Sequence, residues 1–78
     1  MIYSIELETK AKKEFFKLTR EGQELLAAVI EDLSVEPRPS GSKKLQGVEG
    51  YRVRKGKYHI LYTINDRLKL IRIRIDSN

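Results

Sequence analysis

Residues 51–75, YRVRKGKYHILYTINDRLKLIRIRI, decide the fold because apolar and polar residues alternate through most of this stretch. Alternation with a period of two is typical of a β-strand that has one buried and one exposed face. The pattern predicts three strands, separated by Gly56 and by Asn65-Asp66: Tyr51–Lys55, Lys57–Ile64 and Leu68–Ile75. Both interruptions carry residues that favour tight turns. The three strands should therefore form an antiparallel meander.

The N-terminal third predicts one further strand and a helix. Ile2–Leu7 alternates in the same way, with Tyr3, Ile5 and Leu7 on one side. Thr9 has the side chain of an N-cap, and a helix is expected from Lys10 to about Arg20, before Gly22.

A second helix is predicted over Gln23–Ser34, because its leucine, valine and isoleucine residues recur at helical spacing. A short join around Gly22 implies a helical hairpin, and Pro37 and Pro39 prevent the second helix from continuing. Glu36–Gly50 is rich in Pro, Gly, Ser and Lys and is expected to be a surface connection with at most one turn of structure near Leu45.

The order of elements is β-α-α-β-β-β. We expect an α+β fold in which the two-helix hairpin packs on one face of a mostly antiparallel four-stranded sheet. The chain has 78 residues, which is the size of one domain, so residues 1–78 should form a single unit. The other face of the sheet must then meet solvent or a ligand.

Composition narrows the class of protein. Cysteine is absent, so neither disulfides nor thiolate chemistry is available, and the opening MIYSIELETK lacks the pattern of a signal peptide. These features, with no run apolar enough for a membrane span, predict a cytoplasmic protein without a membrane partner.

The net charge is +5 and is unevenly distributed: residues 1–36 carry five Lys/Arg against eight Asp/Glu, whereas residues 37–78 carry eleven Lys/Arg against three Asp/Glu. A local excess of this kind indicates a surface that binds polyanions, although solubility alone also explains it.

Strand alternation assigns the basic residues to one face. If Tyr51, Tyr58 and Tyr62 point into the core with the isoleucines, the residues between them point outward. The open face would then collect Arg52, Arg54, His59, Arg72 and Arg74, and Lys43 and Lys44 would extend it from the preceding connection. Arginine offers planar, bidentate donors to phosphate oxygens, which favours a phosphodiester ligand. The alternative is that exposed strands carry arginine to prevent aggregation.

His59 is the only histidine, and histidine is the side chain that ordinarily exchanges protons near neutral pH. A catalytic role for His59 competes with a structural one. No metal-ligand spacing, phosphate-binding glycine loop or catalytic serine arrangement is evident, and Asp66 and Asp76 are expected to be residues of a turn and of the chain end.

The block KKLQGVEGYRVRKGKYHILYTIND, residues 43–66, resembles the RelE/ParE toxin superfamily, as do IELETKAKKEFFKL and the join VEPRPSGSKKLQG. The resemblance covers nearly the whole chain. It implies a toxin of a type II toxin–antitoxin system, a cognate antitoxin as partner, and no cofactor or metal. RelE-like members cut messenger RNA in the ribosomal A site with the RNA's own 2′-hydroxyl as nucleophile, which leaves a 2′,3′-cyclic phosphate. By this resemblance, Arg52 and Arg54 would orient the phosphate and stabilise its charge, and His59 would assist proton transfer or hold the phosphate.

Two alternatives remain within the same resemblance. A ParE-like toxin would inhibit DNA gyrase by contact and would leave RNA intact. A catalytically weakened member would act mainly by binding its antitoxin. Relatives usually continue past the last strand with further basic residues and a tyrosine, whereas the printed sequence ends with IRIRIDSN at Asn78. Either Arg72 and Arg74 replace those groups, or the protein is a weakened or inactive relative, or the printed sequence lacks the tail.

Overall fold

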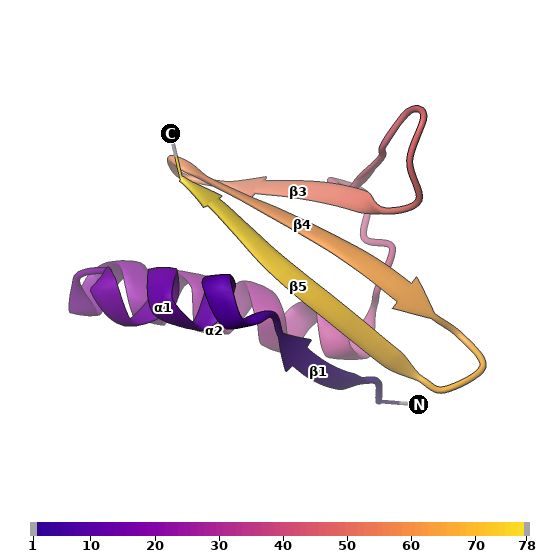
Figure 1. Ribbon diagram of the computed structural model, residues 1–78, viewed down its shortest axis with the longest axis horizontal. Helices are drawn as coiled ribbons and strands as arrows, with labels where there is room; N and C mark the ends of the chain where they lie inside the picture. Colours follow the sequence, from indigo (N-terminus) through magenta and orange to yellow (C-terminus); the bar gives the residue numbers. More distant parts are fainter. Residues whose placement is uncertain (1, 78) are drawn as a thin grey trace.

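The computed structural model describes residues 2–77, and for Asp76 and Ser77 only the backbone. It contains two helices and five strands in one sheet (Figure 1). The elements are β1 (Ser4–Leu7), α1 (Thr9–Lys17), α2 (Arg20–Val35), β2 (Lys43–Lys44), β3 (Tyr51–Lys55), β4 (Tyr58–Asn65) and β5 (Leu70–Ser77). The predicted α+β class is confirmed. No helix in the described part of the chain is long and apolar enough to cross a membrane.

The sheet has the strand order β1-β5-β4-β3-β2, with β1 parallel to β5 and every other pair antiparallel. The prediction of four strands was one too few. Lys43 and Lys44, expected in a surface connection, pair with Arg52 and Tyr51 and form a short edge strand. A two-residue strand has no periodicity of its own, and only its partner β3 makes it a strand.

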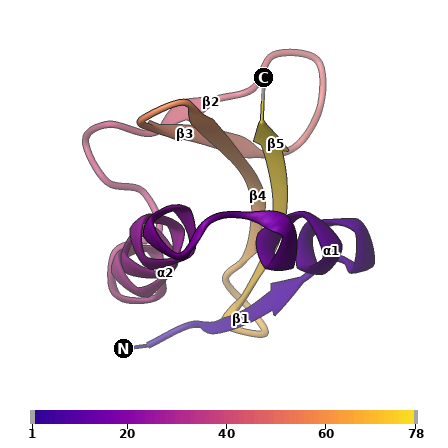
Figure 2. The same ribbon diagram turned by 90° about the vertical axis from the view of Figure 1, so that its left-hand side faces the viewer.

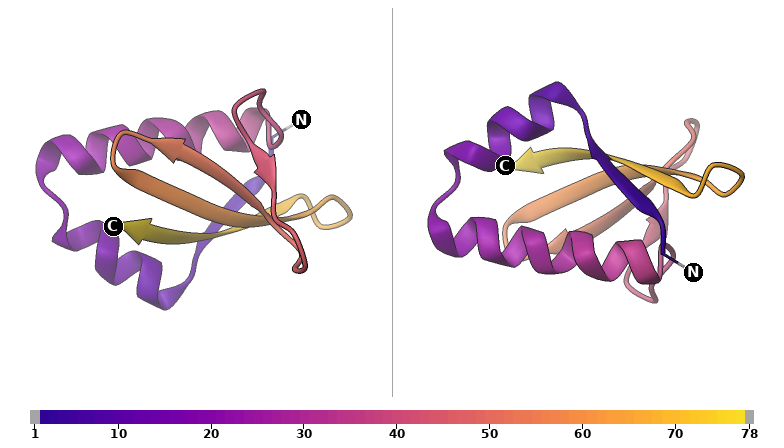
Figure 3. Two further views of the ribbon diagram at one scale, coloured as in Figure 1. Left: turned by 90° about the horizontal axis from the view of Figure 1, so that it is seen from above. Right: turned by 90° about the horizontal axis from the view of Figure 1, so that it is seen from below.

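Both helices lie on one side of the sheet, as predicted (Figure 2). They diverge from their short join, and both remain on the same side of the sheet. The open face is therefore the one seen from above in the left view of Figure 3. Helix α1 packs mainly against β5, and α2 contacts β1 and β3.

The ends of the helices differ from the prediction because a different threonine acts as cap. Thr9 is the first residue of α1 rather than its N-cap, and α1 ends at Lys17. Thr19 caps α2 instead, since its hydroxyl oxygen accepts a hydrogen bond from the Gly22 backbone N–H at 3.1 Å. Gly22 therefore lies in the first turn of α2 rather than in the join. Its lack of a Cβ leaves room for Tyr58, whose hydroxyl oxygen would lie 2.8 Å from a Cβ at this position.

The core lies between the helices and the inward face of the sheet. The fully buried side chains of Leu26 and Leu33 on α2 pack with those of three isoleucines and one tyrosine of the sheet: Ile60, Tyr62, Ile71 and Ile73. The predicted division of residues between the two faces of β3, β4 and β5 is confirmed. This burial sets the register of the sheet, because a slip of one residue would turn every isoleucine to solvent.

The β4–β5 connection is longer than expected. The prediction placed a tight turn at Asn65-Asp66, but Asn65 pairs with Leu70 and four residues separate the strands. The Asn65 side-chain oxygen accepts a hydrogen bond from the Leu68 backbone N–H at 2.9 Å, and Lys69 has a positive φ of 54°.

The first strand is also shorter than predicted. The Tyr3 backbone N–H bonds to the Ser34 carbonyl oxygen, which ties the start of β1 to the end of α2.

We expect Ile73→Ala to lower the free energy of unfolding by about 3 kcal/mol, because the side chain is fully buried in the core between the sheet and the helices. Chemical denaturation followed by circular dichroism measures the change. Leu68→Ala is the matched control, because this side chain is 66% exposed and its truncation should change stability by less than about 0.5 kcal/mol. Equal losses in the two variants would contradict the assigned core.

Candidate nucleic-acid interface

Basic side chains gather where β2, β3 and β4 meet on the open face. Lys43 pairs with Arg52, and Arg54 pairs with His59, so these four residues stand in neighbouring rows of the sheet. Residues that pair directly across strands share a face. Together with Gly41 they line a shallow hollow of about 160 Å³. We call this the basic hollow.

The β3–β4 hairpin places Arg54 opposite His59. Gly56 adopts a positive φ of 58°, which suits a two-residue turn between Lys55 and Tyr58. The Arg54 Nε also donates a hydrogen bond to the Gly56 carbonyl oxygen at 3.3 Å. The turn and the buried isoleucines therefore set the same register.

The electrostatics of the basic hollow favour an anion. Arg52 and Arg54 are exposed and His59 is half-buried, so all three are open to a ligand. Among residues 2–75, no carboxylate lines the hollow, and no ion pair joins Lys43, Arg52 or Arg54 to an acid. Like charges in adjacent strands repel one another. A bound phosphate would relieve this repulsion and accept several hydrogen bonds.

The remaining predicted residues lie outside the basic hollow. Lys44 does not line it, since Lys44 follows Lys43 on the same strand and alternation turns it to the other face. Arg72 and Arg74 stand on the open face, but on β5, and neither lines the hollow. Arg72 is held by Glu6, whose carboxylate accepts a hydrogen bond from Arg72 Nε at 2.7 Å. The pairing of β1 with β5 brings these two residues opposite each other.

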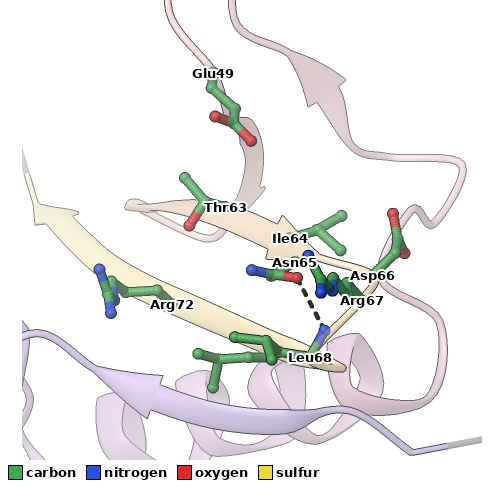
Figure 4. Close-up of a pocket in the computed structure, with 9 residues that line it drawn as sticks. Glu49, Thr63, Ile64, Asn65, Asp66, Arg67, Leu68 and Arg72 are labelled. Carbon is green, nitrogen blue, oxygen red and sulfur yellow. Dashed lines mark hydrogen bonds between the residues drawn. The ribbon is translucent and has the colours of Figure 1, made fainter.

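A larger hollow of about 520 Å³ lies near the β4–β5 connection (Figure 4). Its lining combines acidic residues such as Glu49 and Asp66 with basic ones such as Arg67 and Arg72. This mixture gives no net preference for an anion. The basic hollow therefore fits a phosphate ligand better, although it is smaller.

A polar cluster that the sequence did not reveal holds the α2–β2 connection against the sheet. Arg38 donates to the Asp66 carboxylate at 3.0 Å and to the Tyr51 hydroxyl at 3.1 Å. The Tyr3 hydroxyl donates to the same carboxylate at 2.6 Å. On the buried side of the sheet, the Tyr62 hydroxyl donates to the Pro37 carbonyl oxygen at 2.7 Å. These bonds fix the segment that leads to Gly41 and Lys43 at the basic hollow.

The cluster shifts the pKa values of its members. The hydrogen bonds from Arg38 and then from Tyr3 lower the pKa of Asp66 below its ordinary 3.8. The same contact with Asp66 raises the pKa values of Arg38 and Tyr3, and burial raises the pKa of Tyr62. Asp66 was expected to be only a turn residue. Its isolated position in a turn carried no sign of partners 28 and 63 residues away.

Among the described residues, no group of three or more His, Asp or Glu side chains lies close enough together to hold a metal ion. The Asp76 side chain, expected at the chain end, lies outside the described part of the structure, as do Met1 and Asn78.

Neither a protein-family model nor a curated protein sequence matches the chain. Solved structures do. A chain of the RelBE2 toxin–antitoxin complex of Mycobacterium tuberculosis is 28% identical with a TM-score of 0.84, and the match covers 100% of this chain and 93% of that one. A chain of the archaeal RelE–RelB complex from Pyrococcus horikoshii is 22% identical, with a TM-score of 0.83 and coverage of 99% and 96%.

A chain of the intact Escherichia coli RelBE toxin–antitoxin complex is 21% identical, with a TM-score of 0.85 and coverage of 97% and 96%. The chain thus has the fold of the RelE-like toxin superfamily, which the sequence had suggested. Each match covers nearly the whole chain, so the helices and the sheet are both included.

We expect Asp66→Asn to destabilise the protein at neutral pH, because Arg38 and Tyr3 lose a charged acceptor. The pKa of Asp66 is lower in the folded protein than its ordinary value of 3.8. The contribution of Asp66 to stability is therefore fully present above this ordinary pKa and is lost as the pH falls through the folded pKa. The difference in denaturation midpoint between the wild type and the variant should therefore shrink in acid. Glu31→Gln, on the exposed face of α2, is the control. A difference independent of pH would contradict this account.

Proposed function

We propose that the chain is a RelE-like toxin of a type II toxin–antitoxin system that cuts messenger RNA without a metal ion. The observation that carries this proposal is the basic hollow, in which Lys43, Arg52, Arg54 and His59 surround a space that no carboxylate of residues 2–75 lines. The similarity to RelE toxins supports the toxin class. The chemistry below follows from the residues of the hollow.

The proposed reaction is an internal phosphoryl transfer. The RNA 2′-hydroxyl attacks the adjacent phosphorus, a new bond from the 2′-oxygen to phosphorus forms, and the bond from phosphorus to the 5′-oxygen breaks. The products are a 2′,3′-cyclic phosphate and a 5′-hydroxyl. The 2′-hydroxyl loses a proton and the leaving 5′-oxygen gains one, so the net proton count is unchanged.

The side chains of the basic hollow suit these steps. Arg52 and Arg54 present guanidinium groups to the non-bridging phosphate oxygens, where negative charge increases in the transition state. They remain charged throughout, which makes them a substitute for a metal ion. His59 lies opposite Arg54, and we assign it proton transfer, which an imidazole side chain can perform, or a contact with the phosphate. Lys43 contributes charge that attracts the substrate.

The proposed partners follow from the same comparison. The similar chains belong to complexes of toxins with antitoxins, so we propose a cognate antitoxin for this chain as well. Messenger RNA in the ribosomal A site is the proposed substrate, which requires action in the cytoplasm.

The direct test is to add the purified protein to a translating extract and to map messenger RNA ends by primer extension. We expect cuts within codons that appear only during translation and that leave cyclic phosphate ends. Intact messenger RNA together with inhibited supercoiling by gyrase would replace this proposal with a ParE-like activity. Intact messenger RNA and unaffected gyrase, with tight binding of an antitoxin, would indicate a catalytically weakened member.

Arg54→Ala should slow cleavage by about 100-fold, because a transition-state contact is lost. Lys43→Ala should slow it by less than about ten-fold, because Lys43 acts mainly through attraction at a distance. Single-turnover rates in the same extract measure both. Lys44→Ala is the matched control on the same strand, since Lys44 does not line the basic hollow. Equal losses for Arg54→Ala and Lys43→Ala would refute this division of roles.

A further inference from the structure

A row of three basic side chains and one leucine crosses the sheet at right angles to the strands. Lys43 pairs with Arg52, Arg52 with Leu61, and Leu61 with Arg74, so one residue from each of β2, β3, β4 and β5 stands in line. Directly paired residues share a face, and neighbouring strands lie about 4.8 Å apart. The row therefore extends for roughly 14 Å across the open face. We call it the transverse row.

The transverse row continues from β5 onto α1. Arg74 and Lys10 line one hollow of about 190 Å³, and Leu61 also contributes to its lining. Figure 2 shows why this is possible, because α1 lies beside β5 rather than behind the centre of the sheet. This second hollow has a guanidinium, an ammonium and an apolar surface within one space. It is separate from the basic hollow, with which it shares no lining residue.

The charges of α1 also favour an anion at this place. Lys10 lies in the first turn, where the positive end of the helix dipole makes a cation unfavourable. The first turn contains no acidic residue, and the side chain of the N-cap residue Glu8 makes no capping hydrogen bond. The Glu8 carboxylate lines the same hollow, where its one negative charge stands against the two positive charges of Lys10 and Arg74. A phosphate held by Lys10 and Arg74 would offset both the dipole and the repulsion between the two cations.

Acidic residues border the transverse row on the side of the β4–β5 connection. Glu6 neutralises Arg72, and Glu49 lies across the open face from Arg72 in the hollow of Figure 4. Glu8 lines the same hollow as Arg74 and Lys10 and opposes an anion there. Glu8 and Glu49 also line one hollow with Leu61, Arg72 and Arg74, so carboxylates lie near both arginines. Arg72 is paired with Glu6, whereas no ion pair joins Arg74 to an acid among residues 2–75, and this difference favours the direction toward Arg74.

We propose that an RNA strand bound in the basic hollow continues along the transverse row, with a second phosphate held between Arg74 and Lys10 and a nucleoside packed against Leu61. This inference rests on the proposed function and adds to it the path of the substrate. Arg74 binds phosphate oxygens through two N–H groups, and Lys10 adds a point charge. Half-buried Leu61, between Arg52 and Arg74, is the apolar surface along this path. Arg74 and Lys10 are binding residues and take no part in proton transfer.

Binding of RNA of two lengths tests the path. The probes are a trinucleotide, to occupy the basic hollow, and a longer unstructured strand, both 2′-O-methylated so that they resist cleavage. Arg74→Gln should weaken binding of the longer strand by about ten-fold, with little effect on binding of the trinucleotide. It should also reduce the slope of log affinity against log salt concentration for the longer strand by about one. Glu8→Gln should strengthen binding of the longer strand, because it removes the opposing carboxylate. Fluorescence anisotropy at several salt concentrations measures all of these.

Matched variants on the same molecule make the test specific. Arg72→Gln should cost clearly less than Arg74→Gln, since Arg72 on the same strand and face is already paired with Glu6. Arg67→Gln, in the β4–β5 connection, removes an equal charge away from the transverse row. Denaturation curves confirm that each exposed substitution leaves the fold intact.

Arg54→Gln separates this inference from the proposed function. If Arg54→Gln weakens both probes and Arg74→Gln weakens neither, the basic hollow stands and the transverse path is wrong. If Arg74→Gln acts on the longer strand and Arg54→Gln on neither probe, the path stands and the cleavage site is wrong. Loss of poly-glutamate binding in Arg74→Gln, with RNA binding unchanged, would assign the row to an acidic protein and overturn the proposal.

Discussion

The alternation of side chains along β4 is the constraint on which the rest of the structure depends. Its inward residues, Tyr58, Ile60 and Tyr62, are buried beneath the helices. Its neighbours in sequence, His59 and Leu61, must then face the other way. Because β4 is the central strand, its register is passed to β3 and β5 on either side. The free energy that holds the core together therefore also holds the basic residues in rows on the open face.

The second element of order is the polar cluster around Arg38 and Asp66. Edge strand β2 has only two residues, and its pairing with β3 alone would place it weakly. The bonds of Arg38 to Asp66 and Tyr51, and of Tyr62 to Pro37, anchor the preceding segment at the level of the sheet. This anchoring brings Lys43 to the basic hollow. A surface ion pair of this kind contributes little to overall stability, but it determines where a flexible connection lies.

The distribution of charge on the open face is uneven, and this unevenness supports the proposed path of an RNA strand. Cations free of acidic partners in residues 2–75 lie on the side of β2 and β3, whereas Arg72 on β5 is neutralised by Glu6 of β1. The parallel pairing of the first strand with the last produces this asymmetry, since it brings an acidic residue from the N-terminal half against the basic C-terminal half. The proposed cleavage site uses the cations of β2 and β3, and the proposed substrate path continues from them to Arg74 on β5 and Lys10 on α1.

The sequence by itself determined the α+β class, the inward and outward sets of β3, β4 and β5, and the grouping of Arg52, Arg54 and His59 on one face. These are local properties, because a strand of alternating residues can bury its apolar set in only one register. The tertiary structure alone decided the edge strand at Lys43 and Lys44, the capping of α2 by Thr19, the neutralisation of Arg72 and the cluster of Asp66. Each depends on a partner in another element or on which of two similar residues forms a cap. These features follow from how the elements pack against one another, whereas the alternation of apolar and polar residues is a property of the sequence.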